Sequence, residues 1–440
     1  MSIPPPRNEI AAQASKSTLQ RVKSTGDSSH ADHLDSSDFP EGGVTAWSTA
    51  IGAFLIQFCG AGYTCSYGVF QDFYTRTYLR ILHHLRLRHV SDLQCYSWIG
   101  GINVLLTFSV GLVSGRLLDR GVFYHVMKIG CLLQCLCLFM LSLAKPNAYY
   151  QASLIFLSQG IGSGVGIGLT NVPSITVVSH HFQRRRALVM ALVMTGLSTG
   201  AILQPIILNN LINGRLGFAN GVRVSAGMIS GLLLIAYLLM HTRLPPQPQA
   251  ISYTRVLRNS WRDRPYSCAC LGMAAFEVGL FFVLFYLQLD SRLHGLSKGF
   301  SFYSLTIFNT GSLSGRLTAG VVSAYMGIPN TVIGCSFISS AVIFSMIGLR
   351  SEASAALIGV SYGYFSGGFI ALISPLISYL TPEDSDIGAR IGISFAMSAL
   401  TFCLGAPICR AVLTSHYIWW RPAVLAGVSG SCEVAFCFSG

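Results

Sequence analysis

Residues 300–326 read FSFYSLTIFNTGSLSGRLTAGVVSAYM, which is long enough to cross a bilayer and carries one formal charge, Arg316. No other Lys, Arg, Asp or Glu occurs between Lys298 and Arg350. A helix rises about 1.5 Å per residue, so a centred span places Arg316 roughly 15 Å from either membrane face. An arginine there costs at least ~2.5–3.5 kcal/mol, which something must offset. Either Arg316 meets an anionic ligand or counter-charge in a water-filled cavity, or it snorkels outward or pairs with carbonyl groups.

The composition extends this interpretation to the whole chain. Of its 440 residues 52% are hydrophobic and 10% are charged, whereas a soluble protein averages about 25% charged. The chain is therefore expected to be an all-α membrane protein with twelve transmembrane helices, each near the ~20 residues that a bilayer needs. The expected spans are 44–70, 94–115, 122–144, 150–178, 187–213, 219–241, 266–289, 300–326, 330–349, 353–380, 388–413 and 417–438.

A proline- and arginine-containing segment divides these spans into two sets of six. Residues 242–265 hold Pro245, Pro246 and Pro248, followed by four arginines, and such a composition predicts a cytoplasmic linker. Residues 44–241 and 266–440 then form two six-helix halves. An even number of spans before the linker places the polar tail 1–43 in the cytoplasm too, and its composition predicts disorder.

The charge of +12 follows from basic loops between apolar segments, which indicates membrane orientation and not nucleic-acid binding. One loop disagrees: residues 76–89 should lie outside, yet they carry four arginines. They either form a vestibule that attracts anions or are an oddity of this sequence. The 13 cysteines lie mostly in apolar segments and have no metal-ligand spacing. We expect no metal, no cofactor and no enzyme activity.

Three stretches resemble known transporters. Residues 115–121 (GRLLDRG) resemble the loop motif of the major facilitator superfamily, in which Asp119 can cap or pair at a neighbouring helix end and hold one state of a gate. Residues 41–47 (EGGVTAW) and 182–200 (FQRRRALVMALVMTGLSTG) resemble signatures of its monocarboxylate transporter family, particularly the fungal members.

The resemblance implies two six-helix halves around a central substrate site. The helix 8 arginine of proton-coupled members corresponds to Arg316, but their helix 1 lysine falls near Cys65 and their helix 8 aspartate is Ser312. A carboxylate could still meet Arg316 with Ser312, Asn309 and Ser314 donating hydrogen bonds. Tyr67 is a further expected substrate-binding residue; the expected residues of a cytoplasmic gate are Asp119, Arg120, Arg184, Arg185 and Arg390.

Two acidic residues lie well inside predicted spans: Glu277 in the seventh span and Glu433 in the twelfth. Desolvation would favour a neutral carboxyl there, which is suited to carrying a proton. The alternatives are a structural partner of Arg316 or a neutral acid bonded to a neighbouring helix. Arg390 lies beside the acidic loop 383–386, so we expect a gate pair there.

The expected function is secondary transport of a small, monocarboxylate-like organic anion by alternating access, with proton symport or exchange. Export of a secondary metabolite and transport of a vitamin such as riboflavin are alternatives. A non-transporting nutrient sensor is a third alternative, which the short N- and C-terminal tails disfavour. The expected partners are the small-molecule substrate, a proton or counter-solute, and the lipid bilayer, with no nucleic acid. The expected location is the plasma membrane.

Overall fold

A computed structural model describes residues 42–74, 91–144, 151–243, 253–293, 298–345, 351–382 and 386–413. Residues 1–41 of the predicted tail, the basic loop 76–89 and the twelfth predicted span 417–438 lie outside these ranges. Within them the regular structure is helical, as expected for a chain whose backbone polar groups must be satisfied inside a bilayer.

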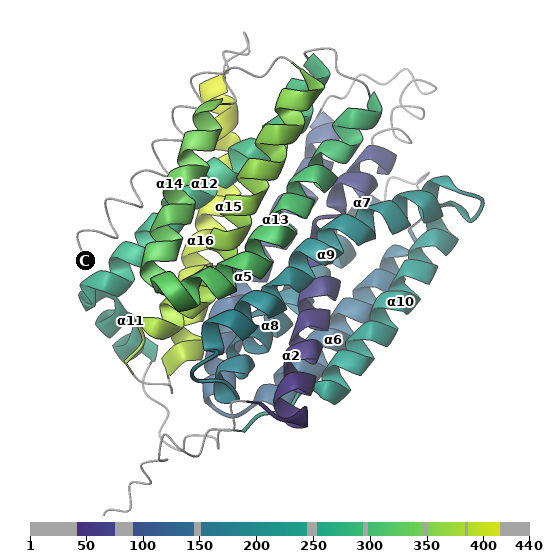
Figure 1. Cartoon of the computed structure of the whole chain (residues 1–440). Coiled ribbons are helices and arrows are strands. Elements are labelled where there is room, and N and C mark those ends of the chain that lie inside the picture. The colour runs from purple at the N-terminus through teal and green to yellow at the C-terminus, as the bar shows by residue number, and fades with distance from the viewer. Residues whose placement is uncertain are drawn as a thin grey trace, which may run out of the picture. The chain divides into compact units, whose positions relative to one another are not determined.

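The helices follow the predicted spans closely. Eight helical segments in the described ranges are long and apolar enough to cross a membrane. In chain order the elements are α2 (Val44–Cys59), α3 (Ala61–Thr64), α5 (Ser91–Asp119), α6 (Phe123–Leu141), α7 (Gln151–Ile155), η1 (Phe156–Gly162), α8 (Ser163–Thr176), η2 (Val177–His180), α9 (Arg186–Asn213), α10 (Gly217–Leu239), α11 (Tyr253–Arg262), α12 (Arg264–Leu293), α13 (Lys298–Met326), α14 (Ile328–Ser345), α15 (Glu352–Tyr379) and α16 (Ile387–Leu413). Figure 1 shows the long helices side by side in a bundle.

Three local features were not predicted. The first span breaks at Gly60, between α2 and α3, and again at a turn over residues 65–66, after which residues 67–74 are helical. The fourth span contains a π-helical turn at η1. The predicted linker holds the short helix α11.

Glycines let helix α13 lie against α15. A Cβ at Gly311 would overlap the backbone of Val360, and one at Gly315 would overlap the backbone of Tyr364. Gly363 of α15 lies equally close to the backbone of Phe308. Small residues allow such approach where the surrounding lipid supplies no hydrophobic drive for helix association. This contact fixes α13, and with it Arg316, in the bundle.

Helix α5 lies against α16 in a second close contact, which joins the two predicted halves. A Cβ at Gly115 would overlap the carbonyl of Gly388. One turn further, Asp119 Oδ2 accepts a hydrogen bond from the backbone N–H of Ala389 at 2.7 Å. Asp119 thus caps the first turn of α16, where a carboxylate is favoured by the helix dipole. This part of the bundle, with α11 beside it, is called the linker end.

Helix α9 meets α15 and α13 across the same boundary. Arg186 Nη1 donates to Ser378 Oγ at 2.8 Å. Gly320 of α13 lies against Leu188 and Ala191 of α9. Together with the α5–α16 contact, these interactions close the bundle at the linker end.

The α13–α15 contact predicts that Gly315→Ala destabilises the protein, because its methyl group cannot be accommodated without moving a backbone. Overpacking costs about 1–3 kcal/mol, so the melting temperature of the purified protein in detergent should fall by several degrees. Gly227→Ala is the matched control, since nothing lies within 4 Å of a Cβ there. Equal melting temperatures for the two variants would contradict this account of the contact.

The cap on α16 predicts that Asp119→Ala speeds hydrogen–deuterium exchange in a peptide that covers residues 387–393. Loss of a helix cap costs about 0.5–2 kcal/mol, and the freed Ala389 N–H should exchange several-fold faster. The exposed Asp72 provides the control variant Asp72→Ala. Unchanged exchange in Asp119→Ala would show that Asp119 does not hold this end.

Candidate functional site

Arg316 is buried in the middle of α13, with 2% of its surface exposed. It does not snorkel outward. Its Nη1 donates a hydrogen bond of 2.5 Å to the backbone carbonyl of Met194 on α9. Its Nε has no hydrogen-bond partner among the residues that the structure describes. A backbone carbonyl carries no full charge, so this contact offsets only part of the cost of burying a guanidinium.

Two of the predicted partners lie on the same face of α13 as Arg316. Ser312, one turn earlier, is buried, and its Oγ accepts a hydrogen bond of 3.2 Å from Ser198 Oγ of α9. Asn309 is buried too, and its Nδ2 donates to the carbonyl of Leu305 at 2.8 Å. Arg316 and Ser312 are therefore placed together at the contact between α9 and α13.

The expectation for Ser314 is wrong. Its side chain is exposed, and its hydroxyl donates to the carbonyl of Thr310 in its own helix at 3.1 Å. Residues two apart on a helix point to different faces, so Ser314 cannot share a ligand with Arg316.

The interrupted first span faces Arg316. Cys65, in the turn between α3 and residues 67–74, is exposed, and its thiol lies close enough to the guanidinium of Arg316 for the two to interact electrostatically. Gly68 and Asp72, which follow in the helical residues 67–74, are exposed as well. A small and polar surface at this position suits water better than lipid. Tyr67 is half-buried against Gly100 of α5.

Glu277 is buried in α12, with 5% of its surface exposed. Its neighbour Phe276 stacks on Phe369 of α15, with ring centroids 3.9 Å apart. Among the described residues, the electrostatic and hydrogen-bonding partners of Arg316 are Cys65 and Met194, so the structure does not pair Glu277 with Arg316. The two buried ionisable groups occupy separate positions.

The predicted gate residues separate into different roles. Arg390 Nη1 forms an ion pair with Asp263 Oδ2 at 2.8 Å and donates to the carbonyl of Leu380 at 3.1 Å. Its guanidinium also lies 4.9 Å from the ring centroid of Tyr266. Arg390 therefore ties α16 to the junction of α11 and α12. Asp263 was not predicted as its partner, because the two are distant in the sequence.

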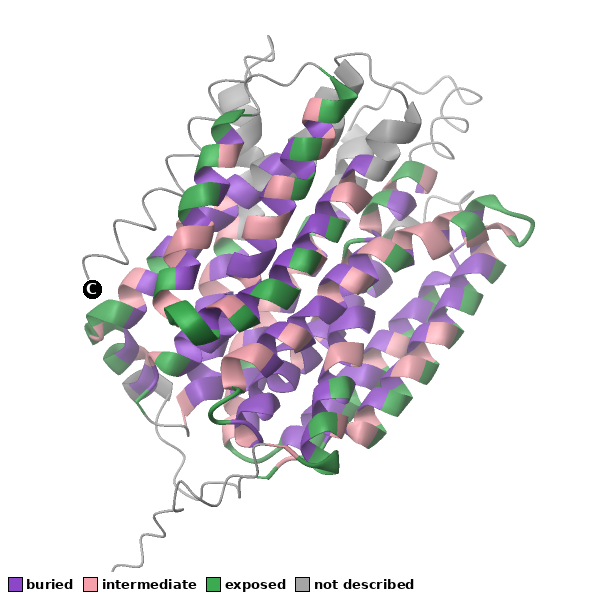
Figure 2. Ribbon diagram, in the orientation of Figure 1, coloured by how far each residue is buried: buried purple, intermediate pink, exposed green. Residues whose placement is uncertain are grey.

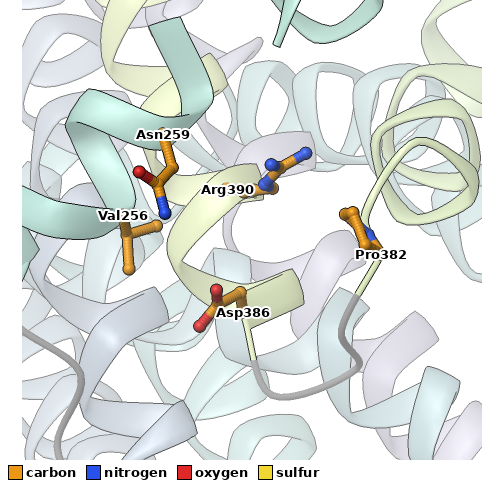
Figure 3. A pocket seen from close by; sticks show the side chains of 5 residues that line it. All are labelled: Val256, Asn259, Pro382, Asp386 and Arg390. Atoms are coloured by element: carbon orange, nitrogen blue, oxygen red, sulfur yellow. The ribbon is translucent and has the colours of Figure 1, made fainter. Parts of the chain in front are cut away.

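A small cavity of about 110 Å³ lies beside Arg390 (Figure 3), lined by Val256, Asn259, Pro382, Asp386 and Arg390. Of the predicted acidic loop, residues 383–385 lie outside the described ranges. Arg120, Arg184 and Arg185 are exposed, whereas the neighbouring Arg186 makes the contact across the boundary. The capping role expected for Asp119 agrees with its bond to Ala389.

Other buried amides bind helices to one another. Gln57 Nε2 of α2 donates to Asn171 Oδ1 and Ser174 Oγ of α8, both at 2.9 Å. Asn103 Nδ2 of α5 donates to the carbonyl of Gln159 at 2.7 Å. In the described part of the chain, no three His, Cys, Asp or Glu side chains are arranged to hold a metal ion. Figure 2 shows buried positions, in purple, along the long helices of the bundle.

Known proteins resemble this chain over most of its length. The aspyridones efflux protein apdF of Emericella nidulans is 33% identical over 383 residues, which cover 87% of this chain and 74% of that protein. The fujikurins efflux protein of Gibberella fujikuroi is 29% identical and covers 88% and 81% of the two chains. The agnestins efflux protein AgnL12 of Paecilomyces divaricatus is 28% identical, with 83% and 80% covered.

Solved structures share the fold at low sequence identity. The proton:xylose symporter XylE matches with a TM-score of 0.71 and 13% identity, over 90% of this chain and 95% of that one. The human organic anion transporter MFSD10 matches with a TM-score of 0.68 and 13% identity, over 90% and 98%. Residues 49–347 match the family described as Major Facilitator Superfamily. The chain is an integral membrane secondary transporter that belongs to the major facilitator superfamily.

Proposed function

We propose that this transporter exports a small acidic secondary metabolite as its anion, and that Arg316 binds the acidic group. The observation that carries the proposal is the burial of Arg316 with a backbone carbonyl, and no carboxylate, as its hydrogen-bond partner in the described residues. An anionic substrate supplies the missing charge. Export is supported by the relatives named as efflux proteins for aspyridones, fujikurins and agnestins.

The chemistry around Arg316 suits an oxyanion. A planar guanidinium presents several N–H donors, and Nε is buried without a hydrogen-bond partner among the described residues. Ser312, on the same face, accepts from Ser198, so its own hydroxyl hydrogen is available to a second acceptor. Asn309, one turn before Ser312, and Tyr67 from the first span extend the proposed site.

The residues around Arg316 favour export of a metabolite over uptake of a small monocarboxylate. The resemblance of residues 41–47 and 182–200 supports the monocarboxylate alternative, but Cys65 and Ser312 stand where those transporters have a lysine and an aspartate. Without these groups the anion-binding charge rests on Arg316. Cys65 and Gly68 are small, and we propose that the space a lysine would fill near Arg316 accepts part of a metabolite larger than lactate.

Alternating access requires the linker end to open while the opposite end closes. The contacts that must separate are the Asp119 cap on Ala389 and the bond from Arg186 to Ser378, because each crosses between the halves. In this proposal the anion on Arg316 replaces the Met194 carbonyl when α9 and α13 move apart. Glu277 supplies the proton step, and the plasma membrane is the proposed location.

The role of Arg316 is tested by deleting the gene in its native organism and comparing metabolites in cells and medium by mass spectrometry. In the deletion strain, the amount of an acidic compound should fall in the medium and rise in the cells. Wild-type protein should restore its export, and Arg316→Ala should restore about 10- to 100-fold less, because a hydrogen bond to a charged group contributes ~1.5–3 kcal/mol.

Arg316→Lys keeps the charge and should restore part of the export. The exposed Arg223 provides the control variant Arg223→Ala, which should behave as wild type. Protein amounts and melting temperatures are compared in parallel, since Arg316→Ala also removes the bond to Met194. Full export by a stably folded Arg316→Ala protein would refute the anion site; retention of only neutral compounds after deletion would refute the substrate class.

The proposed role of Glu277 predicts a change in coupling. In proteoliposomes, Glu277→Gln should abolish transport of the identified acid that is driven by a pH gradient, because an amide cannot release a proton. Exchange of labelled for unlabelled acid at equal pH should continue. Glu352, exposed at the start of α15, gives the matched control Glu352→Gln. If Glu277→Gln keeps the pH-driven transport, another group carries the proton.

A further inference from the structure

Helix α11 has two different faces. Val256 and Ser260, one turn apart, are buried, with 5% and 1% of their surfaces exposed. On the opposite face Arg258 and Arg262 are exposed, and Trp261 between them is 52% exposed. Because residues three and four apart share a helix face, these three side chains form one continuous surface.

The buried face of α11 explains why the helix is held at the linker end. Val256 packs with Ala389 and Ile393 of α16, and Leu112 of α5 and Leu257 of α11 pack against this cluster. Leu112 belongs to the other half of the bundle. Helix α11 therefore covers the contact between α5 and α16.

The end of α11 is fixed at the point where α12 begins. Ser267 Oγ of α12 donates to the carbonyl of Ser260 at 3.1 Å. Asp263, between the two helices, is paired with Arg390, so its charge is committed to α16. Arg264, the first residue of α12, is exposed and adds a third arginine to the exposed side. Figure 1 shows α11 at the end of the bundle beside α16.

The position and the chemistry of this surface suit a membrane. Helix α12 contains the predicted span 266–289, and this prediction would place the end of α11 where the chain enters the bilayer. Arginines at that level meet headgroup phosphates, and an exposed tryptophan is favoured at the headgroup layer. We propose that Arg258, Trp261, Arg262 and Arg264, the α11 basic face, bind the headgroups of anionic phospholipids.

This binding would act on the gate through packing. A lipid-bound α11 is held at the membrane surface, and its opposite face rests on the α5–α16 contact. Anionic lipid therefore stabilises the closed linker end, in addition to the cap that Asp119 provides.

The experiment places the full-length protein in nanodiscs of phosphatidylcholine, with or without phosphatidylserine. Native mass spectrometry counts retained phosphatidylserine, and hydrogen–deuterium exchange follows residues 387–393. Wild-type protein should retain phosphatidylserine and exchange more slowly with it. A variant with Arg258→Gln, Arg262→Gln and Arg264→Gln should bind it on the order of 100-fold more weakly, since each arginine contributes about a fivefold factor.

Two variants serve as controls. Replacing the same three arginines by lysine keeps the charge and should keep most of the binding. Arg215→Gln with Arg223→Gln removes two exposed arginines that flank the start of α10 and should behave as wild type. Undiminished phosphatidylserine binding by the triple glutamine variant would overturn the proposal. So would equal slowing of exchange by inorganic phosphate in detergent, which would assign the face to a free anion.

Discussion

The close approach of helix backbones at glycine is the constraint on which this structure depends. In lipid there is little hydrophobic gain in bringing two apolar helices together, so contact relies on van der Waals packing. Gly311 and Gly315 bring α13 against α15, and Gly115 brings α5 against α16. The first contact positions the helix that carries Arg316, and the second closes the linker end. The same small residues thus serve both the site and the gate.

The buried charged residues differ in the partners that surround them. Asp119 accepts a hydrogen bond from the first turn of α16, and Asp263 forms an ion pair with Arg390, so both carboxyl groups have partners at the linker end. Arg316 has only a backbone carbonyl as hydrogen-bond partner in the described residues, and it lies in the middle of its helix. A charge is expensive at that depth, which makes Arg316 the position where an anionic substrate contributes most.

Hydropathy alone was sufficient to predict the long helices, because each bilayer span needs a continuous apolar stretch. The shared face of Arg316 and Ser312 followed from helical periodicity. Periodicity could not reveal the pairing of Arg390 with Asp263, since both lie far apart in sequence. It was also insufficient for α11, whose ten residues were grouped with a proline-rich linker. Ser314 is near Arg316 in sequence but lies on another face of α13, because residues two apart on a helix point in different directions.

The acceptor for Arg316 on α9 is the main-chain oxygen of Met194. Every amino acid at position 194 supplies that oxygen, so the contact is independent of the side chain that a gene encodes there. A mutational scan of α9 would detect the packing of the Met194 side chain. It would not detect the hydrogen bond that the Met194 carbonyl accepts from Arg316. Only a change that shifts the backbone, such as a larger residue at Gly196, which lies against the backbone of Phe54, would reveal it.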